Sequence, residues 1–318
     1  MKIAVLDTTG RWNIGNEFIN NGLYNLLLDS PSGEHVNYDL VYFRQFESAN
    51  ERLNYPSDWM TKYNKKAINE CDVMVMAGGS CLSKYHVKMF QKIRRDINIP
   101  IILTGASFYE NIELEKDIYS NIFDLFDHVF ARDHATYDAL PDGNKHKSID
   151  TAFWIGDSRK RSVFRQGRLR DYSVVNIDSP ENAKMQFDLA ASLKGDIWLS
   201  RNNPSEMTIF NSDLGRDYNV FVGETLEEYV RFYGHAKHVA TNRVHTFLVC
   251  LLAGTPVQFC HDVVTDFARY FLFHEIGMKL DSTKVVTPED FKAYETILAV
   301  KKQMTADELH EVINSYKK

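Results

Sequence analysis

The sequence predicts an α/β protein with two domains, each built on a parallel β-sheet. Three observations lead to this fold class. The chain has 318 residues, about twice the length of an average domain. Short apolar runs alternate with helical patterns in both halves, as in successive β-α-β units. The alternation stops once, in the basic segment 156–171, which we interpret as the connection between domains spanning residues 1–160 and 170–318.

The first half contains five expected strands. Residues 2–6 form a short apolar run, and a helix follows in which Phe18, Ile19 and Leu23 recur at helical spacing. Residues 72–77 are continuously apolar, which is typical of a buried strand in a parallel sheet. The expected strands are 2–6, 36–43, 72–77, 99–104 and 128–131, and the expected helices are 16–28, 57–70 (with Ser57 as its N-cap) and 82–96.

The second half repeats the alternation and ends in helices. The expected strands are 172–177, 196–199, 219–222, 238–241 and 256–260, and the expected helices are 180–193, 225–233 and 246–253. Residues 289–316 are expected to be mostly helical and to pack back across the first domain. Two such sheets closed by C-terminal helices are the architecture of the GT-B glycosyltransferases and their relatives, in which two Rossmann-like domains face a cleft.

The composition excludes several classes of protein. With 44% hydrophobic and 25% charged residues the chain is globular rather than disordered. A net charge of −6 argues against bulk attraction to nucleic acid. No apolar run reaches the length of a membrane span, and the N-terminus reads as a strand rather than a signal peptide. Cys71, Cys81, Cys250 and Cys260 have no metal-site spacing, so we expect free thiols, no metal and a cytoplasmic protein.

Candidate site residues were sought at strand ends, because ligands of parallel α/β sheets bind beyond the carboxyl ends of the strands. Asn13, Gly15 and Asn16 lie between the first strand and the first helix. Gly15 allows a tight turn, and the helix N-terminus behind it attracts an anion. The alternative is a plain loop in which Asn16 caps the helix.

Two glycine-containing segments follow the next central strands. Gly78, Gly79 and Ser80 come directly after residues 72–77, where the glycines would let backbone N–H groups approach a ligand. Gly105 and Ser107 repeat this arrangement after residues 99–104. We expect both segments to be ligand-binding turns, although a turn chosen only for flexibility fits the second equally well.

Two arginines and a histidine complete the candidates. Arg132 follows strand 128–131, where it either reaches a ligand or pairs with Asp133. Arg243 and His245 follow strand 238–241, and two residues apart on an extended segment they would project to one side. Histidine is the natural general acid near neutral pH, and the following helix adds positive potential. We therefore predict Arg243 and His245 as catalytic, against the alternative of a buried histidine and a structural arginine.

Several common enzyme motifs are missing from the sequence. It contains no G-x-x-x-x-G-K-[ST] loop and no G-x-G-x-x-G fingerprint, which argues against P-loop and standard dinucleotide enzymes. It also contains no G-x-S-x-G elbow of the hydrolases.

In their order along the chain, the strand-end motifs resemble the polysaccharide pyruvyl transferase family. The segment WNIGNEFINNGLYNLL is similar to the family's Asn-x-Gly-Asp segment, with Asn16 in place of the acid. DVMVMAGGS, IPIILTGAS, HVFARDHAT and SIDTAFWI follow in order. HVATNRVHTFLVCLLAGTPVQF resembles the family's Arg-x-His motif with its later Gly-x-Pro.

The resemblance implies a reaction and roles for residues. The family transfers a pyruvyl group from phosphoenolpyruvate to a sugar in polysaccharide biosynthesis and forms a cyclic ketal, without cofactor or metal. His245 would then protonate the donor's methylene carbon, Arg243 would hold its phosphate or carboxylate, and Arg132 would be a second anion ligand. The expected partners are phosphoenolpyruvate and a saccharide acceptor. The expected donor-binding residues are Asn13, Gly15, Asn16, Gly78, Gly79, Ser80, Gly105, Ser107 and Arg132.

Two alternatives stay open at this point. A GT-B-type glycosyltransferase would use a nucleotide sugar held by a carboxylate of the second domain, for which Glu275 and Asp262 are candidates. A catalytically inactive binding protein on the same fold would explain Asn16 and the absence of a lysine from HDVVTDFARYF, the segment that follows Pro256, where Arg269 could compensate. The acceptor sugar, the ketal linkage and the oligomeric state are left open.

Overall fold

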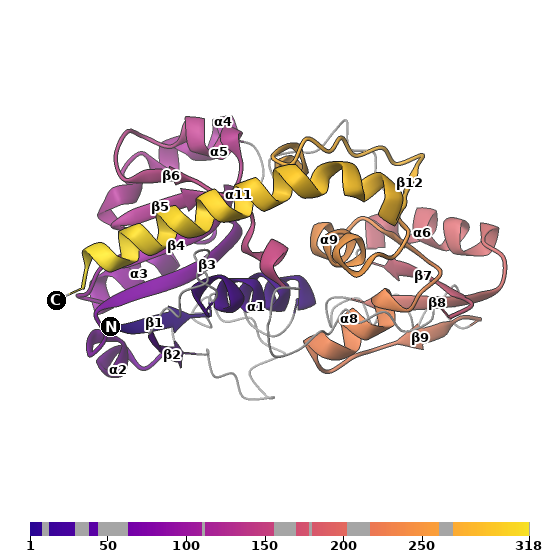
Figure 1. The fold of residues 1–318 in the computed structure, drawn as a ribbon, viewed down its shortest axis with the longest axis horizontal. Helices are drawn as coiled ribbons and strands as arrows, with labels where there is room; N and C mark the ends of the chain where they lie inside the picture. Colours follow the sequence, from indigo (N-terminus) through magenta and orange to yellow (C-terminus); the bar gives the residue numbers. More distant parts are fainter. Residues whose placement is uncertain are drawn as a thin grey trace.

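Two parallel sheets lie side by side along the long axis of the molecule (Figure 1). The computed structural model describes residues 1–7, 13–28, 38–43, 63–109, 112–155, 170–177, 180–201, 217–260 and 270–317. The first half of the chain builds one sheet and the second half builds the other, which confirms the predicted α/β fold with two parallel-sheet domains. The predicted connection lies almost wholly in 156–169, outside the described residues, so the domain boundary stays a prediction.

The first sheet has six strands in the order β2-β1-β3-β4-β5-β6, and all of its pairs are parallel. Its strands are β1 (Lys2–Leu6), β2 (Asp39–Phe43), β3 (Val73–Leu82), β4 (Ile101–Phe108), β5 (His128–Ala131) and β6 (Lys145–Lys147). Its helices are α1 (Ile14–Leu28), α2 (Lys65–Asn69), α3 (Val87–Asp96), α4 (Ile112–Glu115) and α5 (His134–Ala139), with the 3₁₀ turns η3 (Lys116–Tyr119), η4 (Ile122–Asp124) and η5 (Thr151–Trp154).

The second sheet has the order β12-β11-β10-β7-β8-β9, and among its described strands β11 and β12 pair antiparallel while the other pairs are parallel. If β7 is numbered as strand 1, the order from β9 to β12 reads 3-2-1-4-5-6, which is the strand order of a Rossmann domain. Its strands are β7 (Tyr172–Ile177), β8 (Asp196–Arg201), β9 (Asn219–Phe221), β10 (His238–Thr241), β11 (Val257–Phe259) and β12 (Val285–Val286). Its helices are α6 (Pro180–Ser192), α8 (Leu226–Gly234), α9 (Val244–Ala253), α10 (Phe271–His274) and α11 (Pro288–Ser315).

The two glycine segments predicted as turns lie inside strands, so that prediction is wrong. Gly79 and Ser80 belong to β3 and pair with β4, where Ser80 lies opposite Ser107. Glycine at position 78 lets β3 and β4 lie close together, because a Cβ there would come within 2.4 Å of a carbonyl oxygen of β4. Gly79 and Gly105 have φ of +96° and +61°, which L side chains rarely adopt, and these positions let the strands bend while pairing continues.

One predicted helix begins later than expected, and another is described only in part. Leu82 is the last residue of β3, so the following helix begins at Val87. The helix expected over 57–70 is described as α2, and Asn64 caps it by accepting a hydrogen bond from the Ala67 N–H. Ser57 lies outside the described residues.

The C-terminal helix α11 crosses from the second domain back over the first, as predicted (Figure 1). Its N-terminus is closed by a capping box between Thr287 and Asp290. Near its other end, His310 lies 3.0 Å from the Tyr38 hydroxyl and Glu308 accepts from His146 at 2.8 Å. These contacts fix the end of α11 on the first domain.

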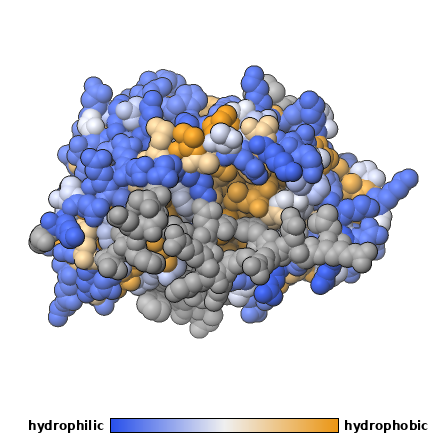
Figure 2. All heavy atoms as spheres, viewed as in Figure 1, coloured by the Kyte–Doolittle hydropathy of each residue, from blue (hydrophilic) through white to orange (hydrophobic). Residues whose placement is uncertain are grey.

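One apolar cluster is shared by both domains, and each domain also has a separate cluster of its own. The largest cluster of buried apolar side chains includes Phe18 of α1, Phe247 of α9 and Leu309 of α11, all without exposed surface. On the face shown in Figure 2, hydrophobic residues gather in the middle, where α11 crosses between the domains. Because α1 and α9 pack in this common core, their N-termini are held in a fixed relation to each other.

Gly22 marks the tightest approach in this core. A Cβ on Gly22 would lie 1.9 Å from the Thr151 carbonyl oxygen. We expect Gly22→Ala to lower the free energy of unfolding by about 2–3 kcal/mol, because backbone must move to admit the methyl group. Gly234→Ala is the matched control, since its Cβ would make only an ordinary 3.5 Å contact. Urea unfolding should show the control unchanged or stabilised by up to about 1 kcal/mol.

Candidate functional site

Each sheet has one topological switch point. At this point the chain leaves two neighbouring strands toward opposite edges of the sheet. These points lie between β1 and β3 in the first sheet and between β7 and β10 in the second. Ligands of open α/β sheets bind beyond the carboxyl ends of the strands at such points. Residues after β1, β3 and β10 are therefore the first place to look for a site.

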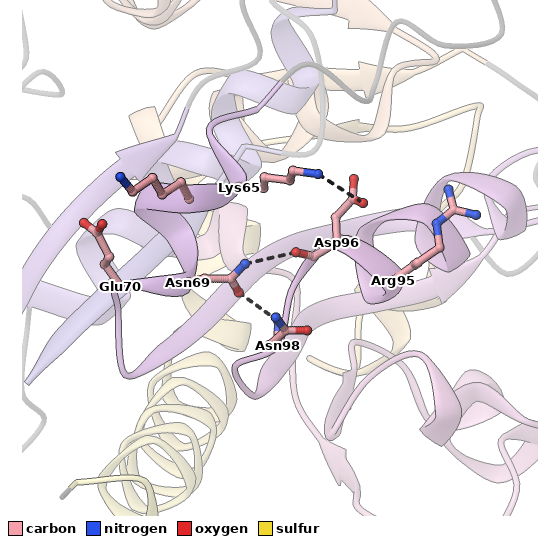
Figure 3. Close-up of a pocket in the computed structure, with 7 residues that line it drawn as sticks. Lys65, Asn69, Glu70, Arg95, Asp96 and Asn98 are labelled. Atoms are coloured by element: carbon pink, nitrogen blue, oxygen red, sulfur yellow. Dashed lines mark hydrogen bonds and ion pairs between the residues drawn. The ribbon is translucent and has the colours of Figure 1, made fainter.

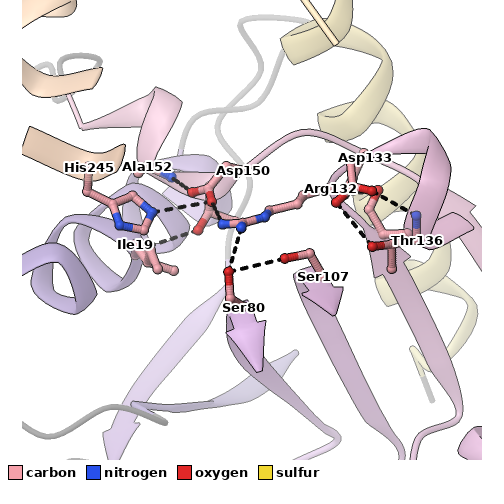
Figure 4. Close-up of polar contacts among 12 residues, drawn as sticks. Ile19, Ser80, Ser107, Arg132, Asp133, Thr136, Asp150, Ala152 and His245 are labelled. Atoms are coloured by element: carbon pink, nitrogen blue, oxygen red, sulfur yellow. Dashed lines mark hydrogen bonds and ion pairs between the residues drawn. The ribbon is translucent and has the colours of Figure 1, made fainter. Parts of the chain in front are cut away.

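Asp150, which follows β6, is the centre of polar contacts that reach Ser80 in β3 and His245 after β10 (Figure 4). Its side chain has no exposed surface. Its Oδ1 accepts from the Ala152 N–H at 2.9 Å, which caps η5. Its Oδ2 accepts from Nη1 of Arg132 at 2.5 Å and lies 3.4 Å from Nε2 of His245. Asp150 thus joins Arg132 of the first domain to His245 of the second.

Arg132 connects Asp150 to the strand ends of the first sheet. Its side chain is 1% exposed, and Nη2 donates to the Ser80 hydroxyl at 2.7 Å. Ser107 in turn donates to Ser80 at 3.4 Å. The alternative that Arg132 pairs with Asp133 on the surface is wrong, because Asp133 is buried and caps α5 by accepting from the Thr136 N–H.

The buried carboxylate of Asp150 is held in its charged form. Burial acts to raise its pKa, but His245, Arg132 and the Ala152 N–H together outweigh burial and hold the pKa well below the ordinary range of an aspartate. Asp150 is therefore an anion at neutral pH, with positive charge or N–H donors around it.

His245 lies at the start of α9, not on an extended segment. Strand β10 ends at Thr241, Arg243 is the N-cap of α9, and the Arg243 N–H donates to the Thr241 hydroxyl at 2.9 Å. The argument that Arg243 and His245 project to one side of an extended segment is therefore wrong. What places the two residues together is the N-terminus of α9, whose positive end favours an anion.

The N-terminus of α1 meets the same imidazole. Asn13, rather than Asn16, caps α1, because its Oδ1 accepts from the Gly15 N–H at 3.0 Å. A Cβ on Gly15 would lie 3.1 Å from Nδ1 of His245. The positive ends of two helices, α1 and α9, thus converge on His245, and such ends are anion-binding positions.

The structure brings most of the predicted residues into one connected set. Gly105 belongs to it as well, since a Cβ there would lie 3.8 Å from Cα of Asp150. Gly79 instead faces Ile19 of α1, and Gly78 packs between strands. The connected residues from the prediction are Asn13, Gly15, Ser80, Gly105, Ser107, Arg132 and His245.

Asp150 itself was not predicted as a site residue. It follows β6, a strand of sequence Lys-His-Lys that has no apolar pattern. Had β6 been recognised, the strand-end rule that led to Arg132 would have led to Asp150 as well.

Glu275, considered as a carboxylate for a nucleotide sugar, takes part in contacts between α10, α5 and α11. It accepts from Nδ1 of His134 at 2.8 Å and from Lys301 at 2.9 Å. Burial acts to raise its pKa, but Lys301 and His134 lower it below the ordinary value. The other candidate, Asp262, lies outside the described residues.

A pocket of about 530 Å³ lies elsewhere, between α2 and α3 (Figure 3). Its lining residues precede β3 and β4, so it opens at the amino ends of the strands. Hydrogen bonds tie its wall together: Asn69 donates to the Asp96 carbonyl and accepts from the Asn98 N–H. This pocket is separate from the site around Asp150.

The described part of the chain contains neither a metal-binding cluster nor a membrane-spanning helix. No group of three or more His, Cys, Asp or Glu side chains in that part of the chain is arranged to hold a metal ion. None of the helices described there combines the length and the apolar character needed to cross a membrane.

The sequence matches the model of one protein family. The family is described as polysaccharide pyruvyl transferase, and the match covers residues 13–258. A comparison with curated proteins gave no match.

Solved structures with a similar fold include UDP-N-acetylglucosamine 2-epimerases. The Rickettsia bellii enzyme is 11% identical, with 99% of this chain and 98% of that chain covered and a TM-score of 0.56. The Methanocaldococcus jannaschii enzyme in complex with UDP-GlcNAc and UDP is 13% identical, with 99% and 100% covered and a TM-score of 0.56. A structure of S. aureus MnaA with UDP is 11% identical, with 99% and 96% covered and a TM-score of 0.58. At these identities the likeness concerns the fold, which is GT-B-like as predicted.

Proposed function

Because the chain belongs to the polysaccharide pyruvyl transferase family, we propose that it transfers a pyruvyl group from phosphoenolpyruvate to two hydroxyl groups of a saccharide, forming a ketal. One observation of the site carries the proposal. A histidine lies between a buried carboxylate and the converging N-termini of α1 and α9. In the proposal, His245 is a proton donor beside helix N-termini that attract a small anion.

The proposed donor suits such a surface. Phosphoenolpyruvate is small and carries several negative charges, so charge-assisted hydrogen bonds can hold it without a nucleotide pocket. We place its phosphate or carboxylate at the N-terminus of α9, where Arg243 is the N-cap. Asn16, in the first turn of α1, and the partly exposed Ser80 are further donor contacts in this proposal.

The proposed reaction uses His245 as a general acid. The imidazolium gives its proton to the methylene carbon of the donor, which becomes a methyl group and leaves the neighbouring carbon electron-poor. One saccharide hydroxyl adds to that carbon and phosphate leaves, after which a second hydroxyl adds and closes the ketal. Of the two hydroxyl protons, one replaces the proton that His245 gave and the other leaves with phosphate. Arg243 and the helix N-termini stabilise the departing phosphate.

Arg132 has an indirect role in this proposal. It was predicted as a second anion ligand, yet its guanidinium is 1% exposed and bonds Asp150 and Ser80. We infer that Arg132 acts through these two residues, holding Asp150 in place and Ser80 toward the donor.

The function is tested by a direct assay of the reaction. Incubation with phosphoenolpyruvate and a panel of bacterial-type glycans should give a product heavier by one pyruvyl ketal, with one phosphate released per ketal. Mass spectrometry and a phosphate assay on the same samples measure both. Release of phosphate without a ketal on any glycan would contradict the transfer step.

Thermal stabilisation separates this function from the two alternatives. A ligand at 100 times its Kd stabilises the folded state by about 2.7 kcal/mol. Phosphoenolpyruvate should therefore raise the melting temperature, whereas UDP-sugars should not. Stabilisation by UDP-sugars alone would favour a glycosyltransferase, and stabilisation by neither would favour an inactive binding protein.

A further inference from the structure

The contact between Asp150 and His245 decides which nitrogen of the imidazole carries a permanent proton. The side chain of Asp150 has no exposed surface, and its Oδ2 faces Nε2 of His245 at 3.4 Å. An ionised carboxylate accepts hydrogen bonds and cannot donate one. Nε2 must therefore be the donor, in the neutral ring as well as in the imidazolium.

The opposite nitrogen faces a different environment. Nδ1 of His245 lies beside Gly15, where an added Cβ would be 3.1 Å away. Because Gly15 has no side chain, the N-terminus of α1 can lie close to Nδ1. The His245 side chain is 16% exposed, so part of the ring is accessible to a ligand while the Asp150 side is closed.

We propose that Asp150 is a positioning residue that keeps Nε2 of His245 protonated, so that Nδ1, beside Gly15, is the nitrogen that exchanges a proton with the substrate. This inference rests on the proposed function, because pyruvyl transfer supplies the substrate that receives the proton. In the transfer, the Nδ1–H bond of the imidazolium breaks as the new C–H bond forms, and the ring is left neutral with its Nε2–H directed at Asp150. Asp150 keeps its charge throughout and stabilises the imidazolium before the transfer.

The charged groups on the elements packed around the ring are Asp150, Arg132, Arg243 and Glu17. Arg132 bonds the same oxygen of Asp150, so it holds the carboxylate in place. Arg243 precedes the ring on its own helix, and Glu17 lies in the first turn of α1. Among the contacts described for His245, Asp150 is the acidic partner of the imidazole.

Nitrogen NMR tests the tautomer without requiring activity. In protein labelled with ¹⁵N-histidine, the His245 signals are assigned by their loss in His245→Gln. The neutral ring of the parent should carry its proton on Nε2, and Asp150→Asn should weaken this preference. A neutral ring protonated on Nδ1 in the parent would overturn the proposal. Because this readout involves no substrate, it stands even if pyruvyl transfer is not observed.

The pH dependence of activity tests the effect on the proton donor. A carboxylate favours the charged form of a neighbouring cation, whereas an amide does not. In Asp150→Asn the alkaline limb of the kcat/KM profile should therefore move to lower pH. A merely structural role would lower the amount of folded enzyme and leave the profile in place, which would contradict the positioning role.

A second variant tests Nδ1 while keeping the Asp150–Arg132 pair intact, so the proposal can be decided even if Asp150→Asn fails to fold. Gly15→Ala places a methyl group against Nδ1. We expect a loss of about tenfold in kcat, since small misplacements at a reacting atom are costly, with the Nε2–H tautomer retained. Gly234→Ala, another helical glycine, is the control and should keep the parent kcat. Unchanged kcat in Gly15→Ala would overturn the assignment of Nδ1.

Discussion

Replacement of His245 by alanine is expected to lower turnover at least about a hundredfold while the fold and donor binding survive. A general acid typically contributes about 10²–10⁴-fold. The fold should survive because the ring is partly exposed and lies outside the apolar core, and because Asp150 keeps its bonds to Arg132 and the Ala152 N–H. Turnover and melting temperature are to be measured on one preparation.

His274→Ala is a suitable control, since His274 is exposed at the end of α10. It should keep the parent turnover. If His245→Ala kept activity within about threefold of the parent and only lowered the melting temperature, His245 would be a structural residue and the proposed acid would be wrong.

Arg132→Leu is expected to lower the free energy of unfolding by about 3–5 kcal/mol, the usual cost of removing one partner of a buried ion pair. Asp150 has no exposed surface, so without the guanidinium much of its charge is left uncompensated. Urea unfolding at neutral pH measures the loss. Arg132→Leu combined with Asp150→Asn should be more stable than Arg132→Leu alone, because a neutral amide needs no counter-charge. Equal stability of the two variants would contradict this explanation.

The same pair predicts a pH dependence of stability. The pKa of Asp150 is lowered in the folded protein, so its contribution is present above the unfolded value of about 3.9 and is lost as pH falls through the folded value. The difference in stability between the parent and Arg132→Leu should therefore shrink below about pH 4. A difference independent of pH would show that packing, rather than charge, explains the loss.

Continuous apolar strands could be predicted closely from the sequence. β5, β7 and β10 have the predicted bounds, because each is a short run dominated by apolar and β-branched residues that local sequence shows directly. The bounds of β3 and β4 could not be predicted in this way. Their extension past the glycines depends on pairing with each other, for example Ser80 with Ser107, which is a contact distant in sequence.

The site residues also divide into those that the local sequence indicates and those that it does not. His245 was found from its place after a strand, although the reasoning from an extended segment was wrong because α9 begins at Val244. Asp150 was missed because β6 has no apolar pattern, and because a carboxylate shows its importance only when Arg132 and His245 are seen to meet at it. Contacts between distant segments are set by packing, which a single sequence does not display.

The apolar core that runs through α1, α9 and α11 has a consequence for how the molecule comes apart. Separating the halves would expose Phe18, Phe247 and Leu309 to water together, so each sheet would keep the cluster on its outer face and lose the one that both share. We expect both halves to unfold in a single cooperative thermal transition. Chains whose two domains meet through polar interfaces unfold in two transitions instead. A lesion anywhere in the shared interior would then weaken the whole chain, including strands far from it.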